Sequence, residues 1–165
     1  MADVKKTLLT PEDIYILEGI LAVRLSNAKE HLQKLDNYES DKEGYAEKRS
    51  FAAGSVDRKR LLLDKVSALK PDPQPDHNYI RAGYTAAGFS PDELEMLVRA
   101  VSYSAAANRK AFEQSVAKAD RGGPKNSGKL RNEALLLKSE WDKKRALLRK
   151  LRKRLPFQVA RGGFH

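Results

Sequence analysis

Two stretches of the chain repeat one another at a constant spacing, and this repeat limits the folds that the sequence can adopt. Residues 56–71 read VDRKRLLLDKVSALKP, and residues 141–156 read WDKKRALLRKLRKRLP. Lysine, arginine and leucine are abundant in this chain, so the shared aspartate and proline carry most of the signal. Aligned over 16 positions at an offset of 85, the stretches are identical at Asp57/Asp142, Lys59/Lys144, Arg60/Arg145, Leu62/Leu147, Leu63/Leu148, Lys65/Lys150 and Pro71/Pro156.

The segments that precede these stretches also match, at an offset of 80. Thr10-Pro11-Glu12-Asp13 and Ser90-Pro91-Asp92-Glu93 both resemble helix starts, because a hydroxyl can cap, proline suits the first turn and acids favour the positive helix end. Apolar residues then recur at alternating steps of three and four, which places them on one stripe, here called the seam. The seam residues are Ile14, Leu17, Leu21, Leu25, Ala28, Leu32 and Leu35, matched by Leu94, Leu97, Val101, Ala105, Asn108, Phe112 and Ser115.

The later stretches carry seams of the same kind. A short connection between two such helices makes them antiparallel neighbours. We therefore expect an all-α protein of two tandem antiparallel helical hairpins, related by internal duplication, which form a four-helix bundle or an elongated coiled-coil pair. The seam residues are Tyr45, Ala52, Val56, Leu63 and Val66 in the second helix, and Ala134, Leu137, Trp141, Leu148, Leu151 and Leu155 in the last.

The expected boundaries follow from caps and breakers. The first hairpin takes residues 1–70, with helices at about 10–37 and 40–69, the latter starting at a capping box of Ser40 and Glu43. Residues 71–89 are expected to be a proline-rich linker with a short helical turn. The second hairpin takes residues 90–156, with helices at about 90–119 and 128–155, and its loop is expected to be longer than the first turn. Residues 157–165 are expected to be a flexible tail.

Composition excludes several classes of protein. The chain has no cysteine, which rules out disulfides and thiol chemistry. Histidines 31, 77 and 165 have no second ligand at metal spacing, and the phosphate-loop-like GPKNSGK at 123–129 is followed by leucine instead of serine or threonine. We therefore expect no enzyme, cofactor, metal or small-molecule substrate.

Two features bear on location. The N-terminal stretch MADVKKTLLTPED lacks a secretory signal, and no apolar run approaches the roughly 20 residues that span a membrane. The sequence therefore predicts a protein of the cytoplasm or of a particle assembled inside a cell, such as a virion or nucleoprotein complex.

The positive charge lies at one end of the chain. The net charge is +10, and residues 121–165 hold 14 Lys and Arg against 3 Asp and Glu, which is a net charge of +11. Such asymmetry is typical of a segment that meets an anionic partner, although a solvated basic helix kept for solubility would look the same.

Comparison of the two repeats locates the added charge. Asp64, Ser67, Ala68 and Leu69 align with four cations in the last helix, while the leucine framework is retained. Helix stability does not require this change, because the first repeat lacks it. We therefore predict a nucleic-acid- or polyanion-binding surface, here called the cationic face, which consists of Lys143, Arg145, Arg149, Lys150, Arg152, Lys153 and Arg154.

Three functions fit these features. The first is a structural or assembly protein whose helices contact protein neighbours or self-associate, and whose last helix contacts the phosphates of nucleic acid, as in a virion, nucleoid or ribonucleoprotein component. The second is an adaptor that binds an acidic protein. The third, membrane-surface association, is disfavoured because the apolar stripe is needed for the seam.

Overall fold

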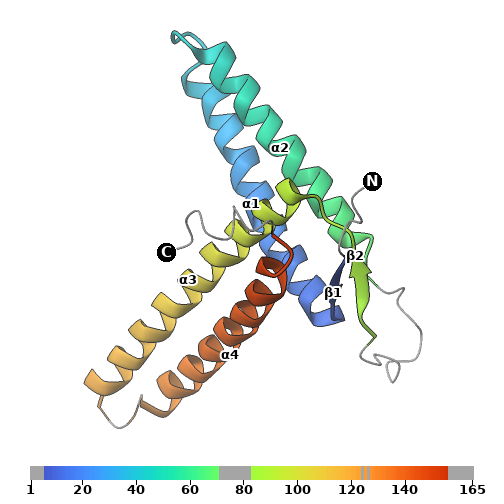
Figure 1. Ribbon diagram of the computed structural model, residues 1–165. Coiled ribbons are helices and arrows are strands. Elements are labelled where there is room, and N and C mark those ends of the chain that lie inside the picture. The colour runs from blue at the N-terminus through green and yellow to red at the C-terminus, as the bar shows by residue number, and fades with distance from the viewer. Residues whose placement is uncertain (1–5, 71–82, 124, 126, 156–165) are drawn as a thin grey trace, which may run out of the picture. The chain divides into compact units, whose positions relative to one another are not determined.

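The protein is mostly helical. The computed structural model describes residues 6–70, 83–123, 125 and 127–155, and helices account for 79% of them. The predicted residues 71–82 of the linker and the tail at 157–165 lie outside the described residues. The four helices are α1 (Pro11–Tyr38), α2 (Tyr45–Ser67), α3 (Pro91–Arg121) and α4 (Ser127–Arg152), as Figure 1 shows.

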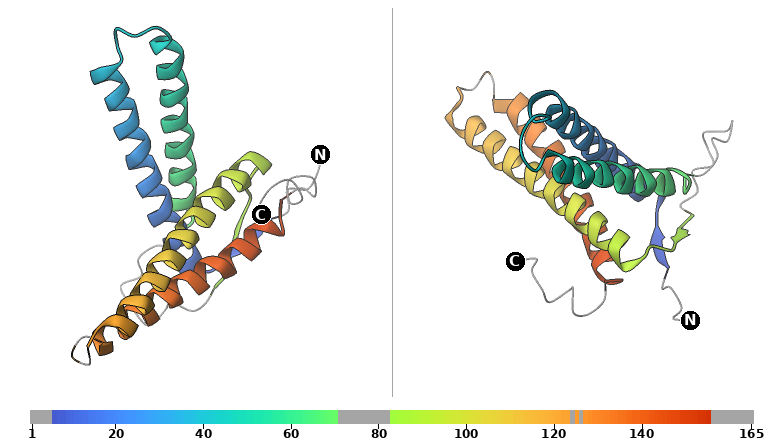
Figure 2. Two further views of the ribbon diagram at one scale, coloured as in Figure 1. Left: turned by 90° about the vertical axis from the view of Figure 1, so that its left-hand side faces the viewer. Right: turned by 90° about the horizontal axis from the view of Figure 1, so that it is seen from above.

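The helices pack as neighbours along the chain. α1 packs against α2, and α3 packs against α4; each pair lies side by side in all three views of Figures 1 and 2. The chain divides into two compact units, one with α1 and α2 and the other with α3 and α4. Each unit therefore has its own helix–helix core.

Both predicted helix starts at a proline are confirmed. The hydroxyl of Thr10 accepts a hydrogen bond from the backbone N–H of Asp13 at 3.1 Å, and the Asp13 carboxylate accepts one from the backbone N–H of Thr10 at 3.0 Å. Ser90 and Glu93 make the same reciprocal pair at 3.2 Å in both directions. Each box satisfies two backbone donors that have no partner within a helix, and this fixes where α1 and α3 begin.

The capping box predicted at Ser40 is wrong. α2 begins five residues later, at Tyr45, after Gly44 with a φ of 80° and no side-chain cap. Residues 40–44 instead form turns, in which Lys42 bonds back to the Glu39 carbonyl and Tyr45 to the Lys42 carbonyl. Glycine enters the left-handed region without the steric cost of a Cβ atom, so the reversal is set at Gly44.

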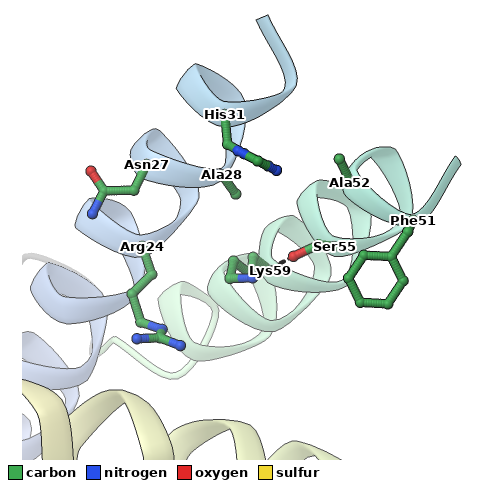
Figure 3. Close-up of a pocket in the computed structure, with 8 residues that line it drawn as sticks. All are labelled: Arg24, Asn27, Ala28, His31, Phe51, Ala52, Ser55 and Lys59. Carbon is green, nitrogen blue, oxygen red and sulfur yellow. Dashed lines mark hydrogen bonds between the residues drawn. The ribbon is translucent and has the colours of Figure 1, made fainter. Parts of the chain in front are cut away.

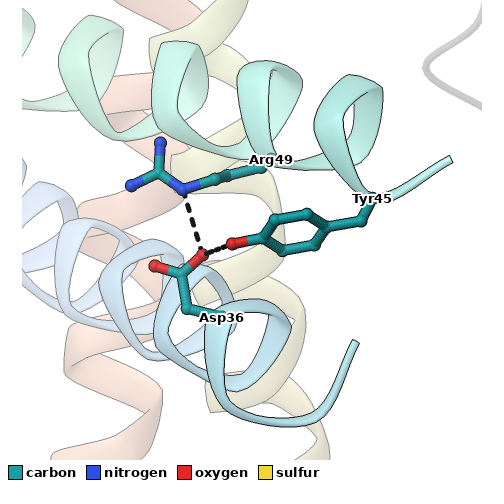
Figure 4. A network of polar contacts seen from close by, with 3 residues as sticks. All are labelled: Asp36, Tyr45 and Arg49. Carbon is teal, nitrogen blue, oxygen red and sulfur yellow. Dashed lines mark hydrogen bonds and ion pairs between the residues drawn. The ribbon is translucent and has the colours of Figure 1, made fainter. Parts of the chain in front are cut away.

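Polar contacts fasten both ends of the α1–α2 pair. Near the reversal, Asp36 accepts hydrogen bonds from the Tyr45 hydroxyl at 2.5 Å and from Arg49 Nε at 3.0 Å (Figure 4). The bond to Asp36 raises the pKa of the Tyr45 phenol above its ordinary value. At the other end, Glu18 accepts from Ser67 at 3.1 Å and from Lys70 at 2.5 Å. The hydrogen bond from Lys70 lowers the pKa of Glu18.

The seams form the cores of both pairs. Ile14, Leu17 and Leu21 of α1 are at most 2% exposed, as is Val66 of α2. In the second pair, Leu97 and Val101 of α3 and Leu151 of α4 are fully buried. The predicted seams missed one matching position in the two pairs: Leu62 and Leu147 are at most 3% exposed, whereas the predicted Leu63 is half-buried. Burial is uneven toward the reversals, where Leu32, Phe112 and Ser115 are half-buried but Leu35, Ala119 and Ala134 are buried.

Two short strands correct the all-α prediction. β1 (Thr7–Leu9) and β2 (Thr85–Ala87) form a two-stranded sheet, whereas the prediction had no strand before the first helix and a short helical turn within residues 71–89. Burial alternates along β1, with Thr7 and Leu9 buried and Leu8 exposed, as the period of a strand requires. The strands lie more than 70 residues apart in the sequence, and three residues are too few to reveal a period.

The connection in the second pair is also shorter than predicted. α3 ends at Arg121 and α4 begins at Ser127, so residues 122–126 join them, against residues 39–44 in the first pair. The offset grows from 80 to 85 because the helices themselves are longer near this connection, α3 at its end and α4 at its start.

Gly44 gives a test of the first reversal. Gly44→Ala should lower the free energy of unfolding by about 1 kcal/mol, because a Cβ atom is strained at this φ. Chemical denaturation followed by circular dichroism measures this. Gly19→Ala is the matched control: Gly19 lies inside α1 with open space around it, and alanine there should stabilise by up to about 1 kcal/mol. Equal effects at both sites would contradict this account of the turn.

Candidate functional site

The rotation of α4 is fixed by its leucines. Leu147, Leu148 and Leu151 are buried against α3, and Leu155 beyond the helix is 7% exposed. Side chains three and four residues apart share one side of a helix, so the positions between these leucines point away from the core. The apolar stripe therefore determines which cations are accessible.

The structure places the cationic face on that outer side, in two degrees of exposure. Arg145, Arg149, Arg152 and Lys153 are exposed, whereas Lys143, Lys150 and Arg154 are half-buried. Lys143 pairs with Glu140 at 3.4 Å on the same helix. The four exposed cations are therefore the most accessible part of the predicted surface.

The last two members lie just beyond α4. The helix ends at Arg152, three residues before the predicted end, but the chain continues to turn. Lys153 bonds back to the Arg149 carbonyl at 3.2 Å, and Arg154 to the Leu151 carbonyl at 3.1 Å. These bonds tighten the last turn and keep Lys153 and Arg154 next to the rest of the cationic face.

Arg145 is held by an aromatic ring. Its guanidinium lies 5.2 Å from the centre of the Trp141 ring, and that of Arg109 lies 5.7 Å from the same ring. Phe112 packs beside Trp141 with a centroid distance of 6.1 Å. Such contacts place a cation without neutralising it. Arg109 of α3 was missed by the sequence analysis, because only the pairing of α3 with α4 brings it to this ring.

Lys144 lies on the inner side of α4, because its position falls on the seam three residues after Trp141 and four before Leu148. It donates a hydrogen bond of 2.5 Å to Asn108 Oδ1 of α3. Burial lowers the pKa of Lys144 below its ordinary value, and the nearby carboxylate of Glu140 opposes this shift. Asn108 and Lys144 therefore serve the helix interface and not the cationic face.

The outer side of α4 changes in chemistry along its length. Leu135, Asp142 and Arg149 follow one another at steps of seven residues, so they lie on the same side of the helix. Leu135 is 64% exposed and its neighbour Leu136 is 70% exposed. Apart from Lys144, which faces α3, residues 141–155 hold seven cations against the single acid Asp142. Two exposed leucines thus precede a strongly positive segment.

Other kinds of site find no support in the part of the chain that the structure describes. No group of three or more histidine, aspartate or glutamate residues is arranged there to hold a metal ion. None of the helices in that part is long and apolar enough to cross a membrane.

Comparison of the chain with protein-family models, with curated proteins and with solved structures found no match. The case for function therefore rests on the chain's own residues.

The Asn108–Lys144 bond can be tested for its role in the interface. Asn108→Ala should lower the free energy of unfolding by about 1 kcal/mol, because the desolvated ammonium group loses its acceptor. A double-mutant cycle with Lys144→Met, measured by chemical denaturation, should give a coupling of similar size. Additive effects of the two substitutions would show that the bond contributes nothing to stability.

Proposed function

We propose that this is a non-enzymatic structural or assembly protein whose cationic face contacts the phosphates of nucleic acid, as in a virion, nucleoid or ribonucleoprotein component. The observation that carries the proposal is the exposure of Arg145, Arg149, Arg152 and Lys153 on one side of α4 and the turn that follows it. Cations on such a face meet phosphates spaced along a backbone and displace counterions, which favours binding without base recognition.

The aromatic residues support contact with phosphates and not with bases. Trp141 is the one aromatic residue of α4, and it is half-buried between Phe112 and the guanidinium groups of Arg109 and Arg145. A base-stacking platform needs an open ring face. Binding should therefore be insensitive to sequence.

The exposed leucines of α4 favour an additional protein neighbour. Leu135 and Leu136 are adjacent and largely exposed, on the part of α4 that precedes the cationic face. Adjacent exposed leucines are more easily explained by a contact than by solvation. An assembly protein that holds nucleic acid with one part of a helix and a protein neighbour with the other fits this order.

We infer further that the α1–α2 and α3–α4 pairs are tandem antiparallel hairpins that arose by duplication. In support, α1 and α3 begin with the same capping box, and the seams keep their register through α2 and α4. Lys59 and Lys144 also occupy matching seam positions. The cationic face is then an addition made to one copy of a shared scaffold.

Charge removal tests the nucleic-acid contact. Changing Arg149, Lys150, Arg152, Lys153 and Arg154 to glutamine should abolish binding to a duplex DNA or RNA oligonucleotide at low salt, with helix content unchanged. The wild-type affinity should fall with salt by roughly 0.7–0.9 log unit per log unit of salt for each phosphate contact. Fluorescence anisotropy over a salt series measures both quantities.

The matched control removes the same charge elsewhere. Glutamine at Lys29, Lys34, Lys42, Lys48 and Arg60, all exposed on the first helix pair or its turn, should leave most of the affinity and the salt slope in place. Equal losses in both variants would mean that net charge alone drives binding. If the wild-type protein does not bind nucleic acid at low salt, the proposal fails. An adaptor for an acidic protein then becomes the better explanation.

Charge transfer tests the equivalence of the two pairs. In the variant that lacks the α4 cations, the substitutions Asp64→Arg, Ser67→Arg, Ala68→Lys and Leu69→Arg place the α4 pattern on α2. If α2 and α4 are equivalent scaffolds, salt-dependent binding should return to within about tenfold of wild type, a difference of about 1.4 kcal/mol. If binding does not return although the variant is folded, α2 and α4 are not equivalent scaffolds for the cationic face.

A further inference from the structure

Each helix pair has a lysine at the same position of its seam, and the surroundings of the two lysines differ. Lys59 of α2 and Lys144 of α4 occupy matching positions, and burial lowers the pKa of both. A partly buried ammonium group needs hydrogen-bond acceptors and a nearby negative charge. The surroundings of the two lysines differ in both respects.

In the second pair these needs are met from within the protein. Asn108 of α3 accepts a hydrogen bond from Lys144, and the carboxylate of Glu140 opposes the fall that burial causes in the pKa of Lys144. The positions that match Asn108 and Glu140 in the first pair are Ala28 and Ser55. At these two positions the first pair therefore has neither the amide nor the carboxylate.

In the first pair the seam lysine faces other cations. Lys59 donates to the Ser55 hydroxyl on its own helix, which takes one of the three N–H donors of the ammonium group. The charges of Arg24 and Arg58 add to the effect of burial and lower the pKa of Lys59 further. Lys59 therefore lies near cations, whereas Lys144 lies near a carboxylate.

A cavity of about 310 Å³ lies at this place between α1 and α2. Its walls include Ala28 and Ala52 and the polar or aromatic residues Arg24, Asn27, His31, Phe51, Ser55 and Lys59. Among these described lining residues there are three basic side chains and no acid. Arg24 and His31 extend from α1 toward α2, which carries Lys59 and Ser55 (Figure 3).

We propose that this cavity between α1 and α2 is a binding site for a phosphate group. An arginine fork, a lysine ammonium and an imidazole N–H supply donors for the several oxygens of a phosphate. No acid is among the described lining residues, so a bound dianion meets no repelling carboxylate on these walls. A water molecule takes roughly 30 Å³ of liquid, so a cavity of this size holds a phosphate together with some of its hydration.

The phosphate can be free or part of a nucleotide, and Phe51 separates these sources. Phe51 lines the cavity and is 75% exposed, so its ring is accessible to a base attached to the bound phosphate. Stacking of a base on an aromatic ring contributes about 1–3 kcal/mol. The site belongs to α1 and α2, so it does not depend on the cationic face of α4.

NMR titration of the full chain tests the proposal. Backbone amide signals of Arg24, Ser55 and position 59 are followed with inorganic phosphate, against sodium chloride at equal ionic strength. Phosphate should give a saturable shift that chloride does not. Lys59→Met should raise the Kd at least tenfold, whereas the matched control Lys144→Met should change it less than twofold.

A second variant gives Lys59 a hydrogen-bond acceptor from the protein itself. Ala28→Asn places an amide where α3 has Asn108, so it should satisfy Lys59, occupy part of the cavity and weaken phosphate binding at least tenfold in a folded protein. The proposal is overturned if the wild type shows no saturable shift, if Lys144→Met weakens binding as much as Lys59→Met, or if Ala28→Asn binds like the wild type.

A mononucleotide distinguishes the two sources. Adenosine 5′-monophosphate that binds at least tenfold more tightly than inorganic phosphate, with this gain lost in Phe51→Ala, would identify a nucleotide site. Equal affinity for the two ligands would identify a site for free phosphate. Either result supports the phosphate site, and binding of adenosine as strong as that of its monophosphate would overturn it.

Discussion

Burial of one apolar stripe between two helices is the constraint on which the rest of this structure depends. A fully buried leucine contributes about 1.5–3 kcal/mol, whereas an exposed ion pair contributes at most about 1 kcal/mol. Leu147 and Leu151, both completely buried, therefore determine how α4 is rotated about its axis. The charged residues contribute less free energy to this choice. The residues on the outer side of α4 are therefore free to vary without changing how the helix packs.

The same burial removes water from the two lysines on the seams, Lys59 and Lys144. A lysine among buried neighbours loses hydration, and the pKa of both Lys59 and Lys144 falls for this reason. The second pair offsets the loss with Asn108, while the first pair instead leaves a cavity beside Lys59. Polar contacts through Glu18 and Asp36 join α1 and α2 on either side of this cavity.

Sequence signals within a few residues predicted the helices well. Contacts between segments that are distant in the sequence could not be predicted. The capping boxes of α1 and α3 need only four residues each, so the sequence alone located both starts. Gly44 was overlooked because Ser40 and Glu43 also fit a capping box, and the choice between the two depends on where the chain must reverse. The pairing of β1 with β2, the ring contact of Arg109 and the cavity beside Lys59 arise only when distant segments meet. Helix periodicity carries no information about such contacts.

The helix dipole does not account for the charge on α4. Its effect is confined to the last turn and is worth less than about 1 kcal/mol per exposed cation. α1 has no basic residue in its last turn and α2 has only Lys65, yet both are regular helices of 28 and 23 residues. α4 has three cations in its last turn, and Arg145 lies upstream, beyond the reach of the dipole. Neighbouring like charges repel, so this accumulation of cations carries a cost in stability. Under our proposal, a bound polyanion removes that cost.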